Sequence, residues 1–364
     1  MLWVQGAIRP QMSWMMREIL EQPEALRRTF RAGREHALEF QRVARKKDFR
    51  LIVLVARGTS DNAALFGRYL FELTTGIPVS LAAPSIHTLY RAPLNLRDSL
   101  VVGISQSGEG TDINRVLEAA KRQGALTIGI TNEARSTMAG LVDEVFLVRA
   151  GKQRSVAATK TYTGQLMALY LLAAALDRGR PDSSGRGGGT LSQVSEIPDH
   201  AREALRLGPE MRALAERYRF MRHCVVVARG VNYANAFELS LKLMETCYVI
   251  AERFSSADFR HGPIALIEPD FPVIIFMPPG KTLPDLKRLA ARLGRLRAET
   301  LLITSRGVKL PAATRAIRIR AAMAELYTPI PYIIPGQLLA AFLAEVKGLN
   351  PDQPRELQIV TKTI

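Results

Sequence analysis

Apolar and polar positions alternate in blocks along the first half of the chain. A helical lead is predicted for about residues 13–45. It precedes five short apolar runs, which are LIVLVA (51–56), IPVSLAA (77–83), SLVVGI (99–104), ALTIGIT (125–131) and EVFLV (144–148). Runs of this length between polar turns are typical of buried strands. Apolar residues at helical spacing predict three helices. The first follows the first apolar run and ends at Leu73, the second covers 111–123, and the third runs from about Thr161 to Leu176. Strands separated by helices predict a parallel, doubly wound α/β sheet.

The same pattern restarts in the second half. The polar, Gly-rich segment RGRPDSSGRGGG (178–189) predicts an interdomain linker. A helix is expected to run through Glu245, and strands are expected at CVVVA (224–228), FPVIIFMP (271–278), TLLIT (300–304) and AIRI (316–319). The predicted segments are a helical lead (1–45), a first domain (46–177), a linker (178–190), a second domain (191–350) and a tail (351–364).

One short stretch occurs in both halves. VLVARGTSDNA (53–63) resembles VVVARGVNYANA (225–236), and each copy spans a predicted strand-to-helix junction. A chance match of a few small residues would give the same letters. Because the position within the α/β pattern also agrees, we interpret the echo as a duplicated α/β unit.

Polar turns follow the predicted strands, including RGTSDN (57–62), SQSG (105–108), RGVNYAN (229–235), SVAATKT (155–161) and SSADFRHGP (255–263). Ligands of open parallel sheets bind beyond the carboxyl ends of the strands, where these turns are expected. SQSG supplies hydroxyls, an amide and a flexible backbone just before a helix capped by Thr111 or Asp112, and this arrangement suits an anion. The alternative is that the serines only cap the helix.

Composition indicates a globular chain. It has 364 residues, enough for two domains, with 47% hydrophobic residues and a mean hydropathy of +0.02. The longest apolar run, Leu166 to Leu176, is shorter than the ~18 residues that span a bilayer, and it predicts a buried helix. The N-terminus lacks a signal-peptide pattern, so a cytoplasmic protein without a membrane partner is expected. Residues 1–11 are expected to be an unstructured extension or a miscalled start.

Charge and metal-binding residue types narrow the possible partners. The net charge of +16 is compatible with nucleic acid, but no nucleic-acid motif accompanies it. A solvated basic surface that favours anionic metabolites is therefore preferred, and no nucleic-acid partner is predicted. Cys224 and Cys247 are expected to be buried thiols. The five histidines show no ligand spacing, so neither a metal nor a cofactor is predicted.

Several motifs together resemble the sugar isomerase (SIS) family. They are GTS (58–60), SQSGEG (105–110), SVAATKTYT (155–163), SLKLMET (240–246), RHGPIALIE (260–268) and DQPREL (352–357), with REILEQP (17–23) at the entry. The similarity is to the isomerase half of glucosamine-6-phosphate synthase and to SIS-fold glucosamine-6-phosphate deaminases. It implies two αβα sandwiches, each around a five-stranded parallel sheet, and a homodimer that acts on a sugar phosphate.

The resemblance also implies roles for individual residues. Gly58, Thr59, Ser60, Ser105, Gln106, Ser107, Ala157 and Ala158 match substrate or phosphate positions, and Thr111 is the candidate substitute for a hydroxyl that relatives carry at Gly110. Glu245 matches the carboxylate that moves a proton between C1 and C2, a role that burial would assist by raising its pKa. The alternative for Glu245 is a plain ion pair with Lys242 on a solvated helix face. Lys242 matches another site position, where it would hold Glu245 or the sugar oxygens.

His261 matches the ring-opening histidine, which acts from the neighbouring subunit in the synthase. An imidazole exchanges protons near neutral pH. The alternative is an ordinary loop histidine held by a backbone hydrogen bond.

Three departures from the family pattern shape the expected reaction. No glutaminase domain precedes residue 13, so glutamine hydrolysis is not expected. Gln153 stands where relatives carry a glutamate, and Ile359 stands where the synthase tail has an imine-forming lysine, with Lys362 roughly 10 Å further along an extended chain. We therefore expect conversion of glucosamine 6-phosphate to fructose 6-phosphate and ammonia through Glu245 and His261. The alternatives are another phosphosugar isomerase or deglycase, and a non-catalytic phosphosugar sensor.

Overall fold

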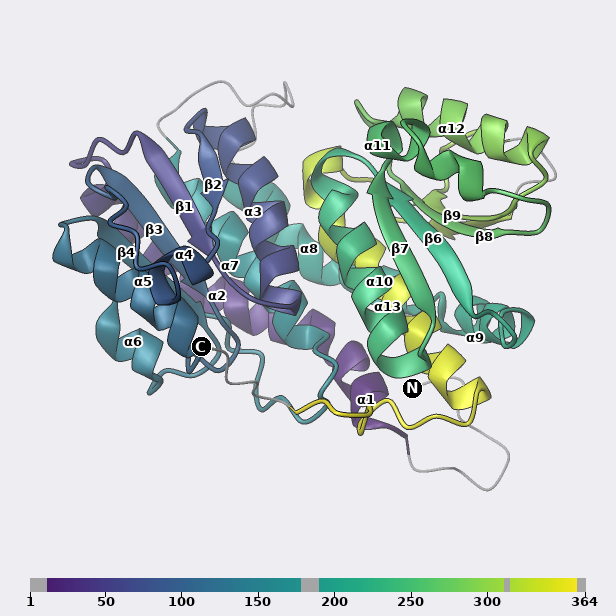
Figure 1. Cartoon of the computed structure of the whole chain (residues 1–364), viewed down its shortest axis with the longest axis horizontal. Coiled ribbons are helices and arrows are strands. Elements are labelled where there is room, and N and C mark those ends of the chain that lie inside the picture. The colour runs from purple at the N-terminus through teal and green to yellow at the C-terminus, as the bar shows by residue number, and fades with distance from the viewer. Residues whose placement is uncertain (1–11, 178–189, 311–314, 359–364) are drawn as a thin grey trace. The chain divides into compact units, whose positions relative to one another are not determined.

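Two parallel sheets of five strands organise the chain (Figure 1). The computed structural model describes residues 12–177, 190–310 and 315–358. The expectations for residues 1–11, the linker at 178–189, Ile359 and Lys362 lie outside the described residues.

The first sheet has the order β2-β1-β3-β4-β5. Its strands are β1 (Leu51–Val55), β2 (Val79–Leu81), β3 (Ser99–Ile104), β4 (Leu126–Thr131) and β5 (Glu144–Leu147). The helices before, between and after them are α1 (Trp14–Leu20), α2 (Gln22–Ala44), α3 (Thr59–Thr75), α4 (Ser85–Thr88), α5 (Thr111–Arg122), α6 (Thr137–Leu141) and α7 (Lys160–Leu176). All five predicted strands are confirmed, with ends that differ by up to two residues.

Alternation along the strands makes this half a three-layer sandwich. Val53, Val55 and Val101 point to one face and pack against Leu117 of α5 and Met138 of α6. Residues one position away point to the other face: the methyl groups of Leu54 lie near Gly67 of α3, together with Leu169 of α7. Because successive side chains of a strand point to opposite faces, helices must cover both sides of such an apolar sheet.

The second sheet repeats the topology, in the order β10-β9-β8-β6-β7. Its strands are β6 (His223–Ala228), β7 (Ile250–Ser255), β8 (Pro272–Met277), β9 (Glu299–Ser305) and β10 (Ala316–Ile319). The helices of this half are α8 (Thr190–Leu205), α9 (Gly208–Arg217), α10 (Tyr233–Cys247), α11 (Ser256–Arg260), α12 (Leu283–Arg295) and α13 (Pro329–Val346), with the short η1 (Gly230–Asn232), η2 (Pro263–Leu266) and η3 (Glu325–Tyr327).

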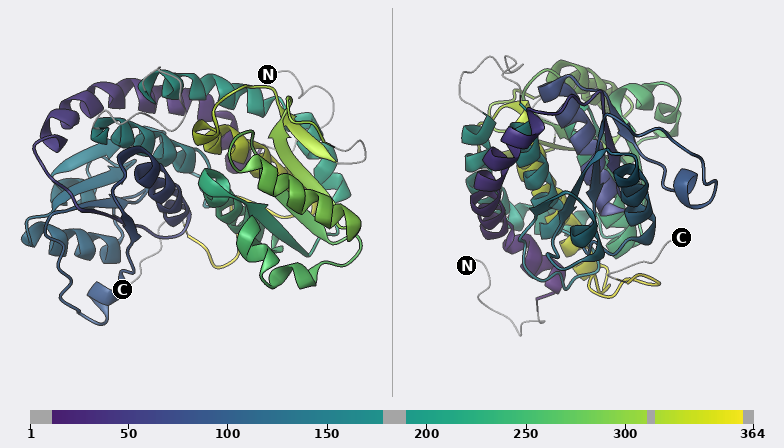
Figure 2. Two further views of the ribbon diagram at one scale, coloured as in Figure 1. Left: turned by 90° about the horizontal axis from the view of Figure 1, so that it is seen from above. Right: turned by 90° about the vertical axis from the view of Figure 1, so that its left-hand side faces the viewer.

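The second sheet is also covered on both faces. Val225, Val227 and Ile275 form a core with Leu286 and Leu289 of α12. Helices α10 and α13, which lie side by side in Figure 1, contact each other and the strands of this sheet; Figure 2 gives two further views. The predicted fold class, α/β with two αβα sandwiches around five-stranded parallel sheets, is confirmed.

Three elements of the second half were not predicted, namely β7, α11 and α13. Strand β7 lies at the edge of its sheet and includes Glu252 and Arg253, so no continuous apolar run marks it. The segment SSADFRHGP, expected to be a polar turn, contains α11. The uninterrupted apolar run Leu166 to Leu176 forms part of the buried helix α7, as predicted. Helix α13, which polar residues and prolines interrupt, is long and apolar enough to cross a membrane by length and composition. In the structure 89% of α13 is buried, as expected for a core helix.

The chain divides into two compact units, which do not coincide with the two halves of the sequence. One unit is built on β1–β5 and takes residues 24–153, 160–177 and 190–198, together with Gln358. The other is built on β6–β10 and takes residues 199–310 and 315–357, together with 12–23 and 154–159. We call these the first and second domain.

The backbone carries the same repeat as the sequence. Gly58 follows β1 with φ 56°, and Gly230 follows β6 with φ 60°. Positive φ strains side chains other than glycine, so both copies of Ala-Arg-Gly need glycine at the same point of the turn. The identical strand order and this shared turn support the duplication inferred from the sequence.

Candidate functional site

The predicted phosphate residues lie at the point where the first sheet changes direction. Strands β1 and β3 are neighbours, and the chain continues from them toward opposite edges of the sheet, to β2 and β4 respectively. Such a switch point leaves a crevice at the carboxyl ends of the two strands. GTS (58–60) directly follows β1 and SQSG (105–108) directly follows β3, so the topology brings these two turns to the same crevice.

The turn after β1 opens helix α3. Gly58 is the N-cap residue with a positive φ, and an added Cβ there would meet nothing within 4 Å. Ser60 is buried, and its hydroxyl accepts a hydrogen bond of 2.9 Å from Nε2 of Gln165 on α7. This contact fixes the Ser60 side chain at the start of the helix, where backbone N–H groups favour an anion.

The turn after β3 is held by its own serines. The backbone N–H of Gly108 donates to Oγ of Ser105 over 3.0 Å, and that of Glu109 donates to Oγ of Ser107 over 3.2 Å. The carbonyl of Gln106 accepts from the backbone of Asn132 at 3.1 Å. The serines therefore shape the turn itself, and the alternative that they only cap helix α5 is wrong.

Gly108 is required by packing as well as by conformation. Its φ is 68°, and a Cβ built on it would lie 2.2 Å from Oγ of Ser136. The neighbouring Glu109 braces the same turn on α6, because its carboxylate accepts from the hydroxyl of Thr137 at 2.6 Å and from the Thr137 N–H at 2.9 Å. These hydrogen bonds also lower the pKa of Glu109. The cradle is thus prearranged before any ligand binds.

The expected cap of helix α5 is incorrect. Gly110 is the N-cap residue and makes no side-chain cap, while Thr111 is the exposed first residue of the helix. Asp112 is instead almost fully buried and receives Nε of Arg57 at 2.6 Å. This ion pair joins the turn after β1 to the helix after β3, the two elements on either side of the crevice. This ion pair was not predicted from the sequence.

Ala157 and Ala158 belong to a different unit of the chain from the cradle. They belong to residues 154–159, which group with the second domain, whereas the cradle lies in the first. Ala157 is buried and Ala158 is partly buried. Their predicted contact with the substrate stays a prediction. Gln153, the departure just before them, is buried and accepts from the hydroxyl of Thr161 at 3.0 Å.

Helix α10 of the second domain carries the predicted catalytic pair. Nζ of Lys242 lies 2.5 Å from Oε2 of Glu245 and 3.6 Å from Oε1 of Glu238. The side chains of Lys242 and Glu238 are 1% and 0% exposed, while that of Glu245 is 20% exposed. A solvated surface pair is therefore wrong for Lys242. Tyr248, which directly follows this helix, is exposed.

Two carboxylates flank the buried ammonium of Lys242 on this helix. Burial alone would lower the pKa of Lys242, but the carboxylates of Glu245 and Glu238 outweigh burial and raise it. Lys242 therefore stays charged and holds Glu245 by a charge-assisted hydrogen bond. Only Glu245 of the three reaches the solvent side of the helix. Glu238 was missed, although its spacing of four residues from Lys242 places both on one helix face.

His261 lies at the end of α11 with its side chain exposed. Its backbone N–H donates to the carbonyl of Asp258 at 3.0 Å. The main chain of His261 is therefore held by a backbone hydrogen bond, as the alternative interpretation expected. The preceding Arg260 is anchored to Asp285 of α12 over 2.8 Å. The hydroxyl of Ser256 also donates to Asp285. These contacts hold the RHGP segment while its imidazole stays accessible to solvent.

The tail motif DQPREL lies against the second domain. The carboxylate of Asp352 accepts from the backbone N–H groups of Trp14 and Met15 at 2.7 and 2.8 Å, at the start of α1. The backbone N–H of Arg355 donates to the Tyr248 hydroxyl at 3.1 Å, and its guanidinium lies 4.4 Å from the centre of that ring. Because Tyr248 follows α10 directly, the tail is fixed beside the end of the helix that carries Glu245.

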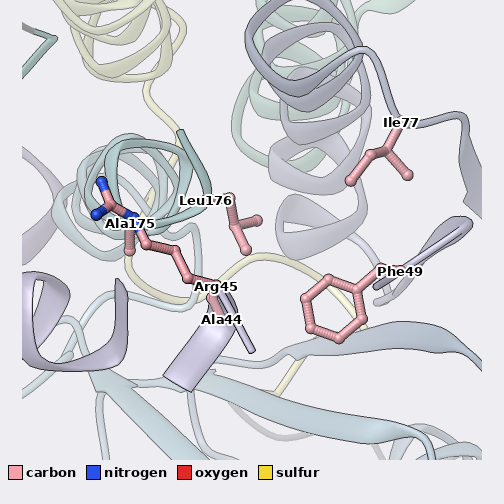
Figure 3. Close-up of a pocket in the computed structure, with 6 residues that line it drawn as sticks. All are labelled: Ala44, Arg45, Phe49, Ile77, Ala175 and Leu176. Carbon is pink, nitrogen blue, oxygen red and sulfur yellow. The ribbon is translucent and has the colours of Figure 1, made fainter. Parts of the chain in front are cut away.

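A small cavity lies elsewhere, in the first domain (Figure 3). Its lining includes Phe49, just before β1, and Ile77, just before β2, as well as Leu176 at the end of α7. It is therefore at the amino ends of the strands, opposite the cradle, and its lining is largely apolar. We assign it no role in chemistry. Among the described residues, no group of three or more His, Cys, Asp or Glu is arranged to hold a metal ion.

Comparison with known proteins agrees with this layout. The model of the SIS domain matches residues 47–175 and 219–343, which contain β1–β5 and β6–β10 respectively. The chain belongs to the SIS domain family. The family resemblance seen in the motifs is thereby confirmed.

The similar proteins include aminotransferases that are longer than this chain, which spans little more than half of their length. Glutamine–fructose-6-phosphate aminotransferase (isomerizing) of Aquifex aeolicus is 34% identical over 357 residues, which cover 94% of this chain and 57% of the relative. The C-terminal domain of the Francisella tularensis enzyme superposes with a TM-score of 0.85 at 27% identity, covering 96% of this chain and 100% of that chain. Glucosamine-6-phosphate deaminase of Thermotoga maritima has a TM-score of 0.73 at 22% identity over 96% of this chain and all of that chain, which establishes only a shared fold.

Proposed function

We propose that the chain is a phosphosugar enzyme that catalyses a proton shift between C1 and C2 and releases ammonia from an amino-sugar phosphate. The substrate we favour is glucosamine 6-phosphate, and the product is fructose 6-phosphate. The observation that carries the proposal is the Glu245 carboxylate, held by a buried ammonium on α10, in a chain whose other domain has a hydroxyl-rich cradle at its switch point.

The cradle supports a phosphorylated substrate. Thr59, Ser60, Ser105 and Ser107 supply hydroxyls, and two strand-to-helix turns supply backbone N–H groups. Neutral donors at helix starts bind phosphate dianions well, because the helix dipole adds to each hydrogen bond. The net charge of +16 adds a long-range attraction for anionic substrates.

The proposed reaction balances without a cofactor. His261 moves a proton from the C1 hydroxyl to the ring oxygen and opens the ring. Glu245 removes the proton from C2, which gives an enolamine, and returns a proton to C1, which gives a ketimine. Water then adds to C2, ammonia leaves and a C2 ketone forms. Ile359, where the synthases have an imine-forming lysine, favours this route over amino transfer through the tail.

A direct assay tests the proposal. Purified protein is incubated with glucosamine 6-phosphate, and ammonia and fructose 6-phosphate are measured together. Equal release of both supports deamination. Ketose formation from an aldose phosphate without an amine, in the absence of ammonia release, would favour the isomerase alternative. Sugar-phosphate binding without turnover of either substrate would favour the sensor and contradict the proposal. Light scattering of the same sample tests the predicted dimer.

A further inference from the structure

The two domains can be aligned residue by residue from their strand pairing. Val55 of β1 pairs with Gly103 of β3, and Val227 of β6 pairs with Ile275 of β8. Both members of the second pair lie 172 positions after those of the first. The same offset relates Gly58 to Gly230 and the first residue of α5, Thr111, to that of α12, Leu283. The second domain therefore has a crevice between β6 and β8 that corresponds to the phosphate cradle.

The donors of the cradle are missing from the second crevice. By this offset Ser105, Gln106 and Ser107 correspond to Met277, Pro278 and Pro279. Methionine has no side-chain donor, and proline has neither a side-chain donor nor a backbone N–H. The hydroxyl and amide contacts proposed for the first domain cannot form here.

An anion nevertheless occupies the second crevice. The carboxylate of Glu325, from η3, accepts the backbone N–H of Lys281 at 2.5 Å and that of Thr282 at 3.4 Å, as well as the Thr282 hydroxyl. Thr282 is the N-cap residue of the 13-residue helix α12. The carboxylate thus sits where a helix start attracts negative charge.

Gly280 makes room for this carboxylate, and Gly230 lies beside it. A Cβ on Gly280 would lie 2.2 Å from Oε2 of Glu325, and a Cβ on Gly230 would lie 3.7 Å from Oε1. Gly230 follows β6 and Gly280 follows β8, so the Glu325 carboxylate lies between the turns that form the crevice. This is the same place, one repeat later, as the proposed phosphate position.

We propose that the second domain has an anion-binding site whose ligand is the chain's own Glu325, and that this carboxylate excludes phosphate monoesters from it. Removing the carboxylate opens the crevice to an external oxyanion of similar size. If the second crevice excludes phosphate monoesters, each chain binds one phosphosugar, in the first domain. That conclusion rests on the function proposed above, whereas the site at Glu325 does not.

The experiment uses the full chain with Ser105→Ala and Ser107→Ala, so that the first cradle is weakened and activity is not the readout. Glu325→Ala is added, and inorganic phosphate at constant ionic strength is titrated while thermal unfolding is followed. We expect phosphate to raise the midpoint of thermal unfolding of this triple variant. Phosphate should bind to it at least about tenfold more tightly than to the Ser105→Ala, Ser107→Ala double variant, because the start of α12 has lost its anion. Glu268→Ala, which removes an exposed carboxylate, is the matched control for net charge.

Two further variants keep the outcome decisive. Adding Thr282→Val to Glu325→Ala should remove much of the phosphate effect, because the hydroxyl donor is lost. If Glu325→Ala does not fold, Glu325→Gln replaces it, with Glu268→Gln as its control. A phosphate effect equal in the Glu325 and Glu268 variants would mean a general response to charge and would overturn the proposal. Because these measurements do not involve turnover, they can succeed or fail independently of the deaminase assay.

Discussion

The two sheet domains share a strand order and a turn, but their crevices differ in what they can bind. The first has Ser105 and Ser107 in a turn braced by hydrogen bonds. The second has Pro278 and Pro279 at the aligned positions and holds the carboxylate of Glu325. A duplicated backbone therefore keeps its anion-attracting geometry even where its donors are replaced. What it binds depends on a few side chains.

The domains also differ in where they bury charge. The first domain buries Asp112 against Arg57 at its crevice. The second domain buries Lys242 between two glutamates on α10, with Glu245 partly exposed. A buried charge is stable only when it is paired, so each pair fixes the geometry of its region. Under the proposed function, the first domain binds the phosphate of the substrate and the second domain transfers the proton. The following substitutions test that comparison.

The largest effect is expected from Glu245→Gln. The amide keeps the shape of the side chain but cannot take a proton from C2, so kcat should fall by about 10³-fold, within the usual range for a general base. Lys242 keeps Glu238 as a partner, and folding should be largely preserved. Steady-state kinetics on glucosamine 6-phosphate give the measurement.

The matched control is Glu252→Gln, which changes an exposed glutamate on β7 of the same domain. Its kcat should equal that of the wild type. A Glu245→Gln enzyme with unchanged kcat would remove Glu245 from the chemistry and, with it, the assignment of reaction to the second domain.

The sequence predicted the sheets well because strands buried on both faces are continuous apolar runs. Nine of the ten strands were predicted, including the edge strands β2, β5 and β10. The tenth, the edge strand β7, was missed because Glu252 and Arg253 interrupt its apolar run. Helix α13 was missed because it is apolar on all sides and includes Pro335, so it shows no amphipathic period.

The site was predicted less completely, for physical reasons. Motif positions predicted roles for Ser105, Ser107 and Glu245, since short polar turns and helix faces are local in sequence. Other contacts at the two crevices join residues that are distant in the sequence: Arg57 and Asp112 are 55 residues apart. Glu325 and Lys281 are 44 apart. No local pattern encodes such contacts, which only the folded topology reveals.

The next largest effect is expected on stability, from Gly108→Ala. The new Cβ would overlap Oγ of Ser136 at 2.2 Å, and the residue must keep a φ of 68°. Together these should lower the free energy of unfolding by about 2–4 kcal/mol. Denaturant unfolding measures the change.

Gly124→Ala separates the two causes. Gly124 has a φ of 83°, but nothing lies within 4 Å of its Cβ position, so only the conformational cost of about 1–2 kcal/mol applies. Equal losses in the two variants would show that the turn tolerates the contact and that the cradle is less rigid than inferred.

A smaller effect is expected from Ser107→Ala. Losing one hydroxyl that binds a charged phosphate should cost about 1.5–3 kcal/mol, seen mainly as an increase in KM with little change in kcat. The aligned substitution in the second domain, Pro279→Ser, should change neither parameter, because Glu325 still fills that crevice. Tighter substrate binding in Pro279→Ser would break the proposed asymmetry between the domains.

The smallest effect concerns pH and the anchoring of the His261 segment. Burial would raise the pKa of Asp285, but hydrogen bonds from Ser256 and Arg260 and the charge of Arg260 outweigh burial and lower it. Because the folded-state pKa is below the unfolded one, this contact stabilises the fold fully above the unfolded pKa. That contribution is lost as the pH falls through the folded pKa. Asp285→Asn should therefore be less stable than the wild type at pH 7, and the difference should shrink below about pH 4. A difference between Asp285→Asn and the wild type that stays constant with pH would indicate that packing, rather than charge, anchors the segment.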